Sequence, residues 1–88
     1  MDVQGIGWAV KQMKNGLKVR RSGWNGKGMW IAIIPADQWG IGSGAPAFDN
    51  WGPGDLQAWV GIRNAQGKVF PWNASQSDLL AIDWEIAE

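Results

Sequence analysis

The spacing of apolar residues divides the chain into one amphipathic helix followed by several short strands. Residues 2–15 place apolar side chains three and four positions apart, which is the spacing of one helix face. Residues 17–21 alternate apolar and polar side chains, as a half-buried strand does. Residues 28–34 form an apolar run, which indicates a strand covered on both faces, with a subunit neighbour as one source of that cover. Residues 57–63 and 68–70 complete the set as a predicted antiparallel pair.

Turn-forming and capping residues mark where these elements end. Gly16 is expected to end the first helix, and residues 64–67 to form the turn between the paired strands. Ser75, with Asp78 three positions later, predicts a capping box at the start of a short second helix. Residues 83–86 have the pattern of a last short strand. Three apolar residues in and after the short helix are expected to turn into the core: Leu79, Leu80 and Ile82.

Together these elements predict an α+β fold, with a small antiparallel sheet of four to five strands, an N-terminal helix and a short C-terminal helix. We expect one domain over residues 1–88, since a chain of 88 residues is the size of a single small domain. Residues 35–55 form a long segment with Gly, Pro and Trp and without periodicity, which we interpret as a loop. Its large aromatic residues are expected to fold it back onto the body or to close it over a pocket: Trp39, Phe48 and Trp51.

Eight tryptophans in so short a chain change this picture. Each indole can bury about 150–250 Å² of surface. One small core cannot enclose all eight of them, so some must face a partner subunit, a ligand or solvent. The composition therefore predicts oligomerisation, ligand binding or both.

The composition also argues against several classes of function. The chain has no cysteine and no histidine, which removes the usual nucleophilic thiol, general base and commonest metal ligands. Its formal net charge is zero, so the basic footprint of a DNA- or RNA-binding protein is missing. No apolar stretch approaches the roughly 20 residues that cross a bilayer, and the N-terminus does not resemble a secretory leader. We expect a cytoplasmic protein that partners neither a membrane nor a nucleic-acid polymer.

Acidic residues give little reason to expect catalysis or a metal. Asp78 and Asp83 could form a carboxylate pair, but Asp78 is better explained as a helix cap. The aspartates of the long segment lack the spacing of a metal motif: Asp37, Asp49 and Asp55. We therefore expect no enzyme activity, no metal and no cofactor.

Binding is the chemistry that remains, and the residues suited to it gather in two segments. Trp24 and Trp72 offer flat faces on which a planar ring can stack. Asn25 and Asn73 offer amide groups for the edge of a base or for sugar hydroxyls. The alternative is a tight hairpin whose tryptophans serve only the core.

A second group of residues favours a ligand that carries phosphate. Lys27, Arg20 and Arg21 could neutralise phosphates, although the two arginines also fit a solvated strand face. Ser75 and the free N–H groups of the helix that it starts could form a small anion site. These residues favour a nucleotide-like small molecule over a sugar.

Two segments resemble a known family. The sequences GWNGKGM at residues 23–29 and PWNASQSDLLAIDW at residues 71–84 resemble the phage Thoeris anti-defence family of the second type. Residues 14–21 fit the same family, and the resemblance extends over residues 3–34 and 57–86.

The resemblance implies a phage counter-defence protein that binds and sequesters a cyclic ADP-ribose isomer, or in some relatives a cyclic oligonucleotide, without cleaving it. It also implies a homo-oligomer, typically a tetramer, acting in the cytoplasm of the infected host, with pockets between subunits. By residue match, one side of the pocket would be lined by Trp24, Asn25, Gly26 and Met29, and the other by Pro71, Trp72, Ala74 and Ser75. Asp83 and Trp84 match the family too, but we interpret them as structural.

The aromatic residues by themselves leave two other functions open. One is a tryptophan-rich module that binds glycans or peptides. The other is a structural phage component that assembles without any small-molecule ligand.

Overall fold

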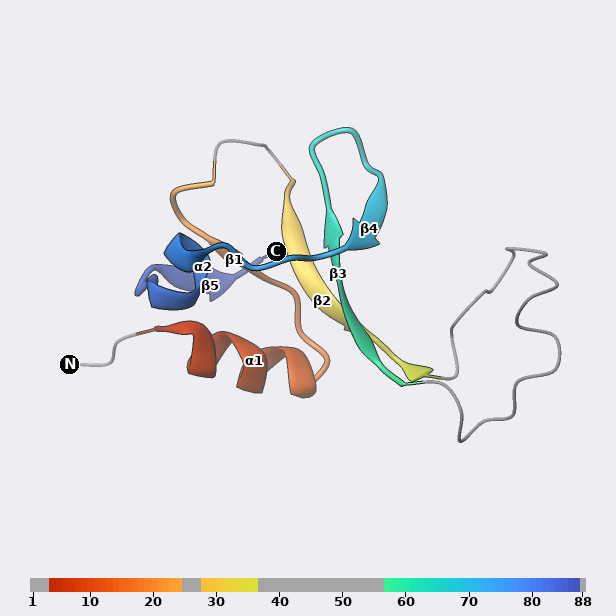
Figure 1. The fold of residues 1–88 in the computed structure, drawn as a ribbon, viewed down its shortest axis with the longest axis horizontal. Coiled ribbons are helices and arrows are strands. Elements are labelled where there is room, and N and C mark those ends of the chain that lie inside the picture. Colours follow the sequence, from red (N-terminus) through yellow and green to blue (C-terminus); the bar gives the residue numbers. More distant parts are fainter. Residues whose placement is uncertain (1–3, 25–27, 37–56, 88) are drawn as a thin grey trace, which may run out of the picture.

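The computed structural model describes residues 4–24, 28–36 and 57–87 and gives these segments an α+β fold (Figure 1). This confirms the predicted fold class: an N-terminal helix, a five-stranded antiparallel sheet and a short C-terminal helix. Most of the predicted loop 35–55 lies outside the described residues. In chain order the elements are α1 (Ile6–Lys14), β1 (Val19–Arg21), β2 (Trp30–Ile34), β3 (Trp59–Arg63), β4 (Val69–Pro71), α2 (Gln76–Leu80) and β5 (Trp84–Ile86).

The sheet has the strand order β4-β3-β2-β1-β5, and each neighbouring pair is antiparallel. Its register lines up apolar residues across four strands, with Val19 opposite Ile31, Ile31 opposite Ile62, and Ile62 opposite Phe70. Because residues paired directly across antiparallel strands share a face, this row defines one apolar face of the sheet.

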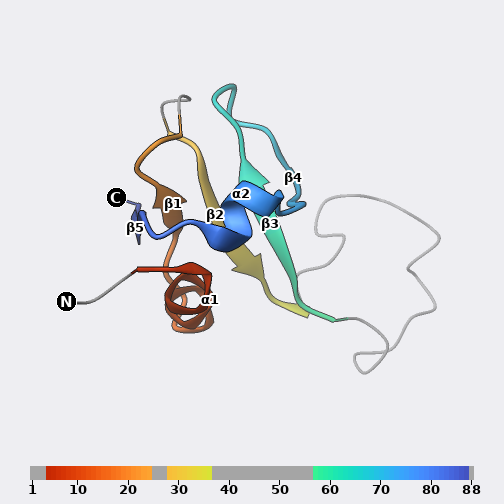
Figure 2. The same cartoon turned by 60° about the vertical axis from the view of Figure 1, so that its left-hand side comes forward.

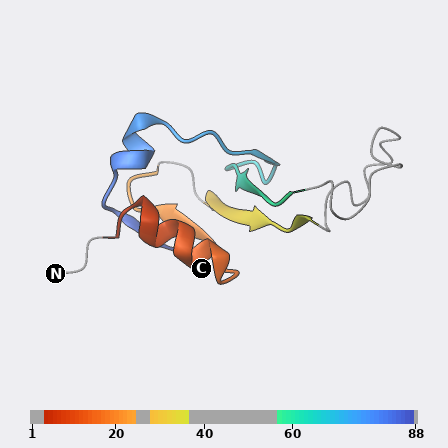
Figure 3. The same cartoon turned by 60° about the horizontal axis from the view of Figure 1, so that its bottom comes forward.

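Helix α1 covers that face, beside β1, β2 and β5 (Figures 1 and 3). Ala9 and Met13 of α1 are buried against Val19, Ile31 and other core residues. Helix α2 contacts α1, and both helices belong to the same side of the molecule (Figure 2). The sequence spacing of α1 therefore did predict the stripe that packs on the sheet.

The opposite face of the sheet is only half-buried. Trp30, Ala32 and Ile34 alternate with the buried Ile31 and keep part of their surface exposed. Lys18 places its ammonium 5.1 Å from the Trp30 ring centroid, a cation–π contact on this face. In the described part of a single chain both helices lie on one face of the sheet, so the predicted cover of the other face of β2, with a subunit neighbour as one source, stays a prediction.

Helix α1 is shorter than predicted because residue 4 is held in an extended conformation. Gln4 forms a parallel bridge with Asp83, and the Gln4 carbonyl accepts a hydrogen bond from the Trp84 N–H at 3.1 Å. The helix then begins at Ile6 with Gly5 as its N-cap. The helix ends at Lys14 with Asn15 as its C-cap, and Gly16 follows as the expected terminator, with a φ of +87° in the left-handed region that favours glycine.

The predicted core role of the residues around α2 is wrong. Leu79, Leu80 and Ile82 are 45%, 78% and 68% exposed. Helix α2 is only five residues long, and its buried residue is Asp78, which is turned toward Trp84 and Arg21. One short turn cannot present both this carboxylate and its leucines to the core.

The predicted strand 68–70 corresponds to β4, which begins at Val69 and includes Pro71 as its last residue. Pro71 pairs with Gly61 of β3. A proline is tolerated there because β4 is an edge strand.

In the described segments, no helix is long and apolar enough to cross a membrane.

The buried row predicts a graded loss of stability at Ile31, which has no exposed surface. Ile31→Val should lower the free energy of unfolding by about 0.5–1.5 kcal/mol and Ile31→Ala by about 2–5 kcal/mol, because each leaves a larger cavity. Urea denaturation measures both. The control Gln66→Ala, at an exposed turn position, should stay within about 0.5 kcal/mol of the parent. Equal effects of the three substitutions would contradict the assigned core.

Candidate functional site

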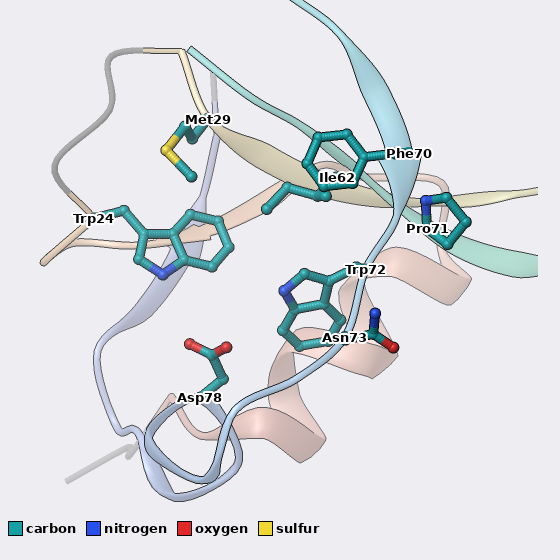
Figure 4. Close-up of a pocket in the computed structure, with 8 residues that line it drawn as sticks. All are labelled: Trp24, Met29, Ile62, Phe70, Pro71, Trp72, Asn73 and Asp78. Atoms are coloured by element: carbon teal, nitrogen blue, oxygen red, sulfur yellow. The ribbon is translucent and has the colours of Figure 1, made fainter.

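A pocket of about 380 Å³ opens beside the apolar row, on the face of the sheet that α1 covers in part (Figure 4). This volume lies within the range of about 300–1,000 Å³ typical of small-molecule sites. Figure 4 shows Trp24 and Trp72 on two sides of the pocket, with Asp78 below them and Met29 and Phe70 above. The eight lining residues within the described part of the chain are Trp24, Met29, Ile62, Phe70, Pro71, Trp72, Asn73 and Asp78.

Trp24 is brought to the pocket by the turn that follows β1. Its backbone N–H donates to the Arg21 carbonyl at 3.2 Å, and the Ser22 N–H donates to the Asp83 carbonyl at 3.0 Å. These bonds bend the chain immediately after the strand. The Trp24 side chain is half-buried, and it packs on the core while one part lines the pocket.

Trp72 is brought to the opposite wall by the end of β4. Its N–H donates to the Val60 carbonyl at 2.9 Å, which extends the pairing of β3 and β4 by one residue beyond Pro71. Like Trp24, it is half-buried and packs against the core cluster. Asn73 follows it into solvent and lines the rim of the pocket.

The two pocket indoles share a single buried support, Trp84. The Trp84 ring has no exposed surface, and it meets Trp24 edge-to-face at a centroid distance of 5.4 Å and an angle of 79°. It meets Trp72 at 5.9 Å and 90°. Its Nε1–H donates to the Asp78 carbonyl oxygen at 3.3 Å, so the buried indole has its polar group satisfied. The positions of both walls therefore depend on one ring.

A charged network lies directly beneath the pocket. Arg21 donates from Nε to Asp83 Oδ1 and from Nη1 to Asp78 Oδ1, both at 3.0 Å. The second oxygen of Asp83 accepts the Ser22 hydroxyl at 3.2 Å and the Gly23 N–H at 3.3 Å. The second oxygen of Asp78 accepts the Ser75 N–H at 3.0 Å, and the Asp78 N–H donates to Ser75 Oγ at 3.1 Å. The last two bonds confirm the predicted capping box.

This network keeps its acids ionised. The side chain of Arg21 lowers the pKa of Asp83 below its ordinary value, opposed by partial desolvation and aided by the Gly23 N–H and the Ser22 hydroxyl. Burial acts to raise the pKa of Asp78, but hydrogen bonds from Ser75 and Arg21 outweigh it and leave that pKa lowered. The two carboxylates in turn raise the pKa of Arg21. All three groups are therefore charged at neutral pH.

The pocket can hold a flat, largely apolar ring and offer it few polar contacts. Six of the eight lining side chains are apolar or aromatic, and the other two are the Asn73 amide and the Asp78 carboxylate. Both Asp78 oxygens already accept hydrogen bonds from within the chain. The arrangement suits stacking with limited recognition of a ligand edge, and it presents no free nucleophile among the lining residues.

The structure places four of the eight predicted site residues around this pocket: Trp24, Met29, Pro71 and Trp72. Asn25 and Gly26 lie outside the described residues. Ala74 and Ser75 are exposed and follow the lining residues without joining them. Whether any of these residues binds a ligand stays a prediction.

Four described lining residues are not among the site residues predicted from the family match: Ile62, Phe70, Asn73 and Asp78. Ile62 and Phe70 are direct cross-strand partners, so the strand pairing could have shown that they share the pocket face. Asp78 was predicted only as a helix cap. Its place in the pocket lining goes with a hydrogen bond from Arg21, which is 57 positions away in the sequence. Asn73 was already a candidate for its amide group.

The two arginines predicted to contact phosphate do not line this pocket. Arg21 is engaged by two carboxylates, and Arg20 points to the other face of the sheet, where it pairs with Glu85 at 3.5 Å. At the predicted anion site, the Asp78 carboxylate accepts the Ser75 N–H and the Ser75 hydroxyl accepts the Asp78 N–H, so these groups are already engaged. Anion binding at this helix start stays a prediction. Lys27 lies outside the described residues.

Among the described residues, no group of three or more acidic side chains could hold a metal ion. The aspartates of the long segment, Asp37, Asp49 and Asp55, lie outside the part that the structure describes.

Fold and pocket together define a small α+β domain with an aromatic pocket of ligand size. Residues 4–87 match the family described as the Thoeris anti-defense 2-like domain. The chain is also 36% identical over 89 aligned positions to the protein of Bacillus phage SP01 named Thoeris anti-defense 2, with 92% of this chain and 91% of that protein covered. The chain belongs to the Thoeris anti-defense 2-like family, and its function is therefore in phage anti-defence.

The charged network predicts a stability that falls in acid. Because the pKa of Asp83 is lowered in the folded state, its contribution is present above the ordinary aspartate pKa of about 3.9 and is lost as pH falls through the lowered value. Asp83→Asn should flatten the dependence of the unfolding free energy on pH between about pH 6 and about pH 3. Denaturant titrations over this range measure it. The control is Glu85→Gln, which disturbs the exposed pair with Arg20 and should keep the pH dependence of the parent protein. If Glu85→Gln flattened this dependence as much as Asp83→Asn, the stabilising role assigned to Asp83 would be refuted.

Proposed function

We propose that this protein sequesters a cyclic ADP-ribose isomer, and thereby removes an immune signal from the infected cell without cleaving it. The observation that carries the proposal is the pair of half-buried indoles, Trp24 and Trp72, fixed on two sides of one pocket by the buried Trp84. Two preset aromatic walls favour stacking on a planar base, worth about 1–3 kcal/mol per base. Membership of the Thoeris anti-defense 2-like family supports the same reading.

Binding without cleavage fits the chemistry of the pocket. The chain has neither cysteine nor histidine, and the carboxylate that lines the pocket is held by Arg21 and the Ser75 N–H. Although burial acts to raise the pKa of this carboxylate, hydrogen bonds from Ser75 and Arg21 leave that pKa lowered, whereas an efficient general base has a pKa near the working pH. A sequestering protein instead needs affinity and slow release, and a preorganised pocket favours both.

The proposal includes a homo-oligomer, with a tetramer as the expected form, in the host cytoplasm. Support comes from apolar side chains that a single chain leaves in solvent, among them Leu80, Ile82 and Val69. Exposed apolar side chains mark an association surface where they form a contiguous patch. Light scattering on the purified protein measures the number of subunits.

A glycan- or peptide-binding module is the alternative, and one observation favours it. None of the eight described residues that line the pocket carries a positive charge. Such a lining suits the C–H face of a sugar as well as a base, whereas a diphosphate would need cations from beyond these eight residues.

A release experiment tests sequestration directly. The protein is mixed with a cyclic ADP-ribose isomer, unbound ligand is removed by filtration, and the retained fraction is heated and analysed by mass spectrometry. We expect the intact cyclic compound to be recovered in proportion to protein. Recovery of an altered product would show an enzyme, and retention of neutral sugars with no retention of the cyclic compound would favour the glycan module.

The two walls should contribute separately to binding. Trp24→Ala and Trp72→Ala are each expected to weaken binding of the cyclic ADP-ribose isomer by about 5- to 150-fold, equivalent to about 1–3 kcal/mol of lost stacking. Isothermal titration calorimetry measures the affinity, and far-UV circular dichroism confirms that each variant is folded. Trp30→Ala, at a half-buried indole on the other face of the sheet, is the matched control and should bind like the parent. Unchanged affinity in both pocket variants would place the ligand elsewhere.

A further inference from the structure

We propose that Arg21 is a positioning residue for the pocket: its guanidinium joins the turn that carries Trp24 to helix α2 and so fixes the aromatic wall in a binding-competent position. The inference rests on the proposed function for its ligand, and it adds a role that differs from the phosphate contact predicted from the sequence. Arg21 does not line the pocket.

The first half of the link holds the turn that carries Trp24. Arg21 Nε donates to one oxygen of Asp83, and the other oxygen of that carboxylate accepts the Ser22 hydroxyl and the Gly23 N–H. The Arg21 carbonyl accepts the Trp24 N–H at 3.2 Å. The three consecutive residues before Trp24 therefore all donate hydrogen bonds to the Asp83 carboxylate, which leaves the turn few alternative conformations.

The second half reaches the floor of the pocket. Arg21 Nη1 donates to Asp78 Oδ1 at 3.0 Å, and Asp78 lines the pocket. The carbonyl of the same residue accepts the Trp84 Nε1–H at 3.3 Å. Trp84 then supports Trp24 and Trp72 edge-to-face. One guanidinium is thus connected to both indole walls through groups that are each in direct contact.

The geometry requires an arginine. Nε and Nη1 lie in one plane and donate in fixed directions, which lets a single side chain satisfy two carboxylates from different elements. A lysine keeps the charge but has a single ammonium that can move between the two acids. The adjacent Arg20 shows the contrast: it is 40% exposed, faces the other side of the sheet and has one pairing at 3.5 Å. Exposed pairs of that kind contribute little.

The test compares Arg21→Lys with the matched control Arg20→Lys. Amide hydrogen exchange followed by NMR reads the positioning role without any ligand. We expect Arg21→Lys to lose protection at Gly23, Trp24 and Ser75 while core amides such as Ile31 and Ile62 keep theirs, and Arg20→Lys to match the parent throughout. Loss of protection spread evenly over the core would show a general structural role and overturn the proposal, as would unchanged protection at the turn.

Binding is the second readout. With a cyclic ADP-ribose isomer as the probe, Arg21→Lys should raise the Kd by about 2- to 30-fold, mainly through faster dissociation, the range typical of residues that act through others. Unchanged affinity in Arg21→Lys would overturn the proposal. If the parent protein does not bind the probe, the proposed function fails, while the exchange data still decide the positioning role. Should Arg21→Lys fail to fold, Ser22→Ala removes one bond to Asp83 and must show the same local loss of protection for the inference to stand.

Discussion

The buried indole of Trp84 is the contact on which the pocket depends. It lies on β5, at one edge of the sheet, yet it touches the aromatic residue after β1 and the one after β4, which enters from the opposite edge. Edge-to-face aromatic pairs are directional, so a ring fixed in the core transmits its orientation to its neighbours. Because Trp84 also donates to the Asp78 carbonyl, α2 is held in the same arrangement.

The charged side chains around Trp84 pair with one another and stabilise the fold, and Arg21 among them does not line the pocket. Arg21 is the described cation nearest in sequence to Trp24, and it is enclosed by Asp78 and Asp83 beneath the pocket rather than presented inside it. Satisfying both acids within the chain avoids an unpaired charge below the indoles, which would be costly in a partly buried position. The described lining is left largely apolar, with the paired Asp78 carboxylate at its floor and the Asn73 amide at its rim. In the proposed function, contacts to phosphate therefore come from residues outside the described lining.

The sequence predicted the elements with clear periodicity and missed what depends on distant pairing. Short stretches of sequence were enough to predict three features: the apolar spacing of α1, the capping box at Ser75, and the positions of Trp24 and Trp72 on two walls of a pocket. Arg20 and Arg21 looked alike, because which of them faces α2 follows from pairing with β5, more than 60 positions away. The exposure of Leu79 and Leu80 was missed for the same reason: Asp78, drawn inward by Arg21, decides which side of the short helix is buried.

In a domain of this size, the same large side chains can both pack on the core and line a binding pocket. Small domains bury a limited share of their surface, so residues reserved for binding would reduce an already small core. Trp24 and Trp72 avoid this conflict, since one part of each ring packs on the core cluster while another part lines the pocket. Their packing also fixes them before any ligand arrives, which lowers the entropy lost on binding. The same arrangement makes affinity sensitive to the core: a change that loosens Trp84 would release both walls together, even though Trp84 itself does not line the pocket.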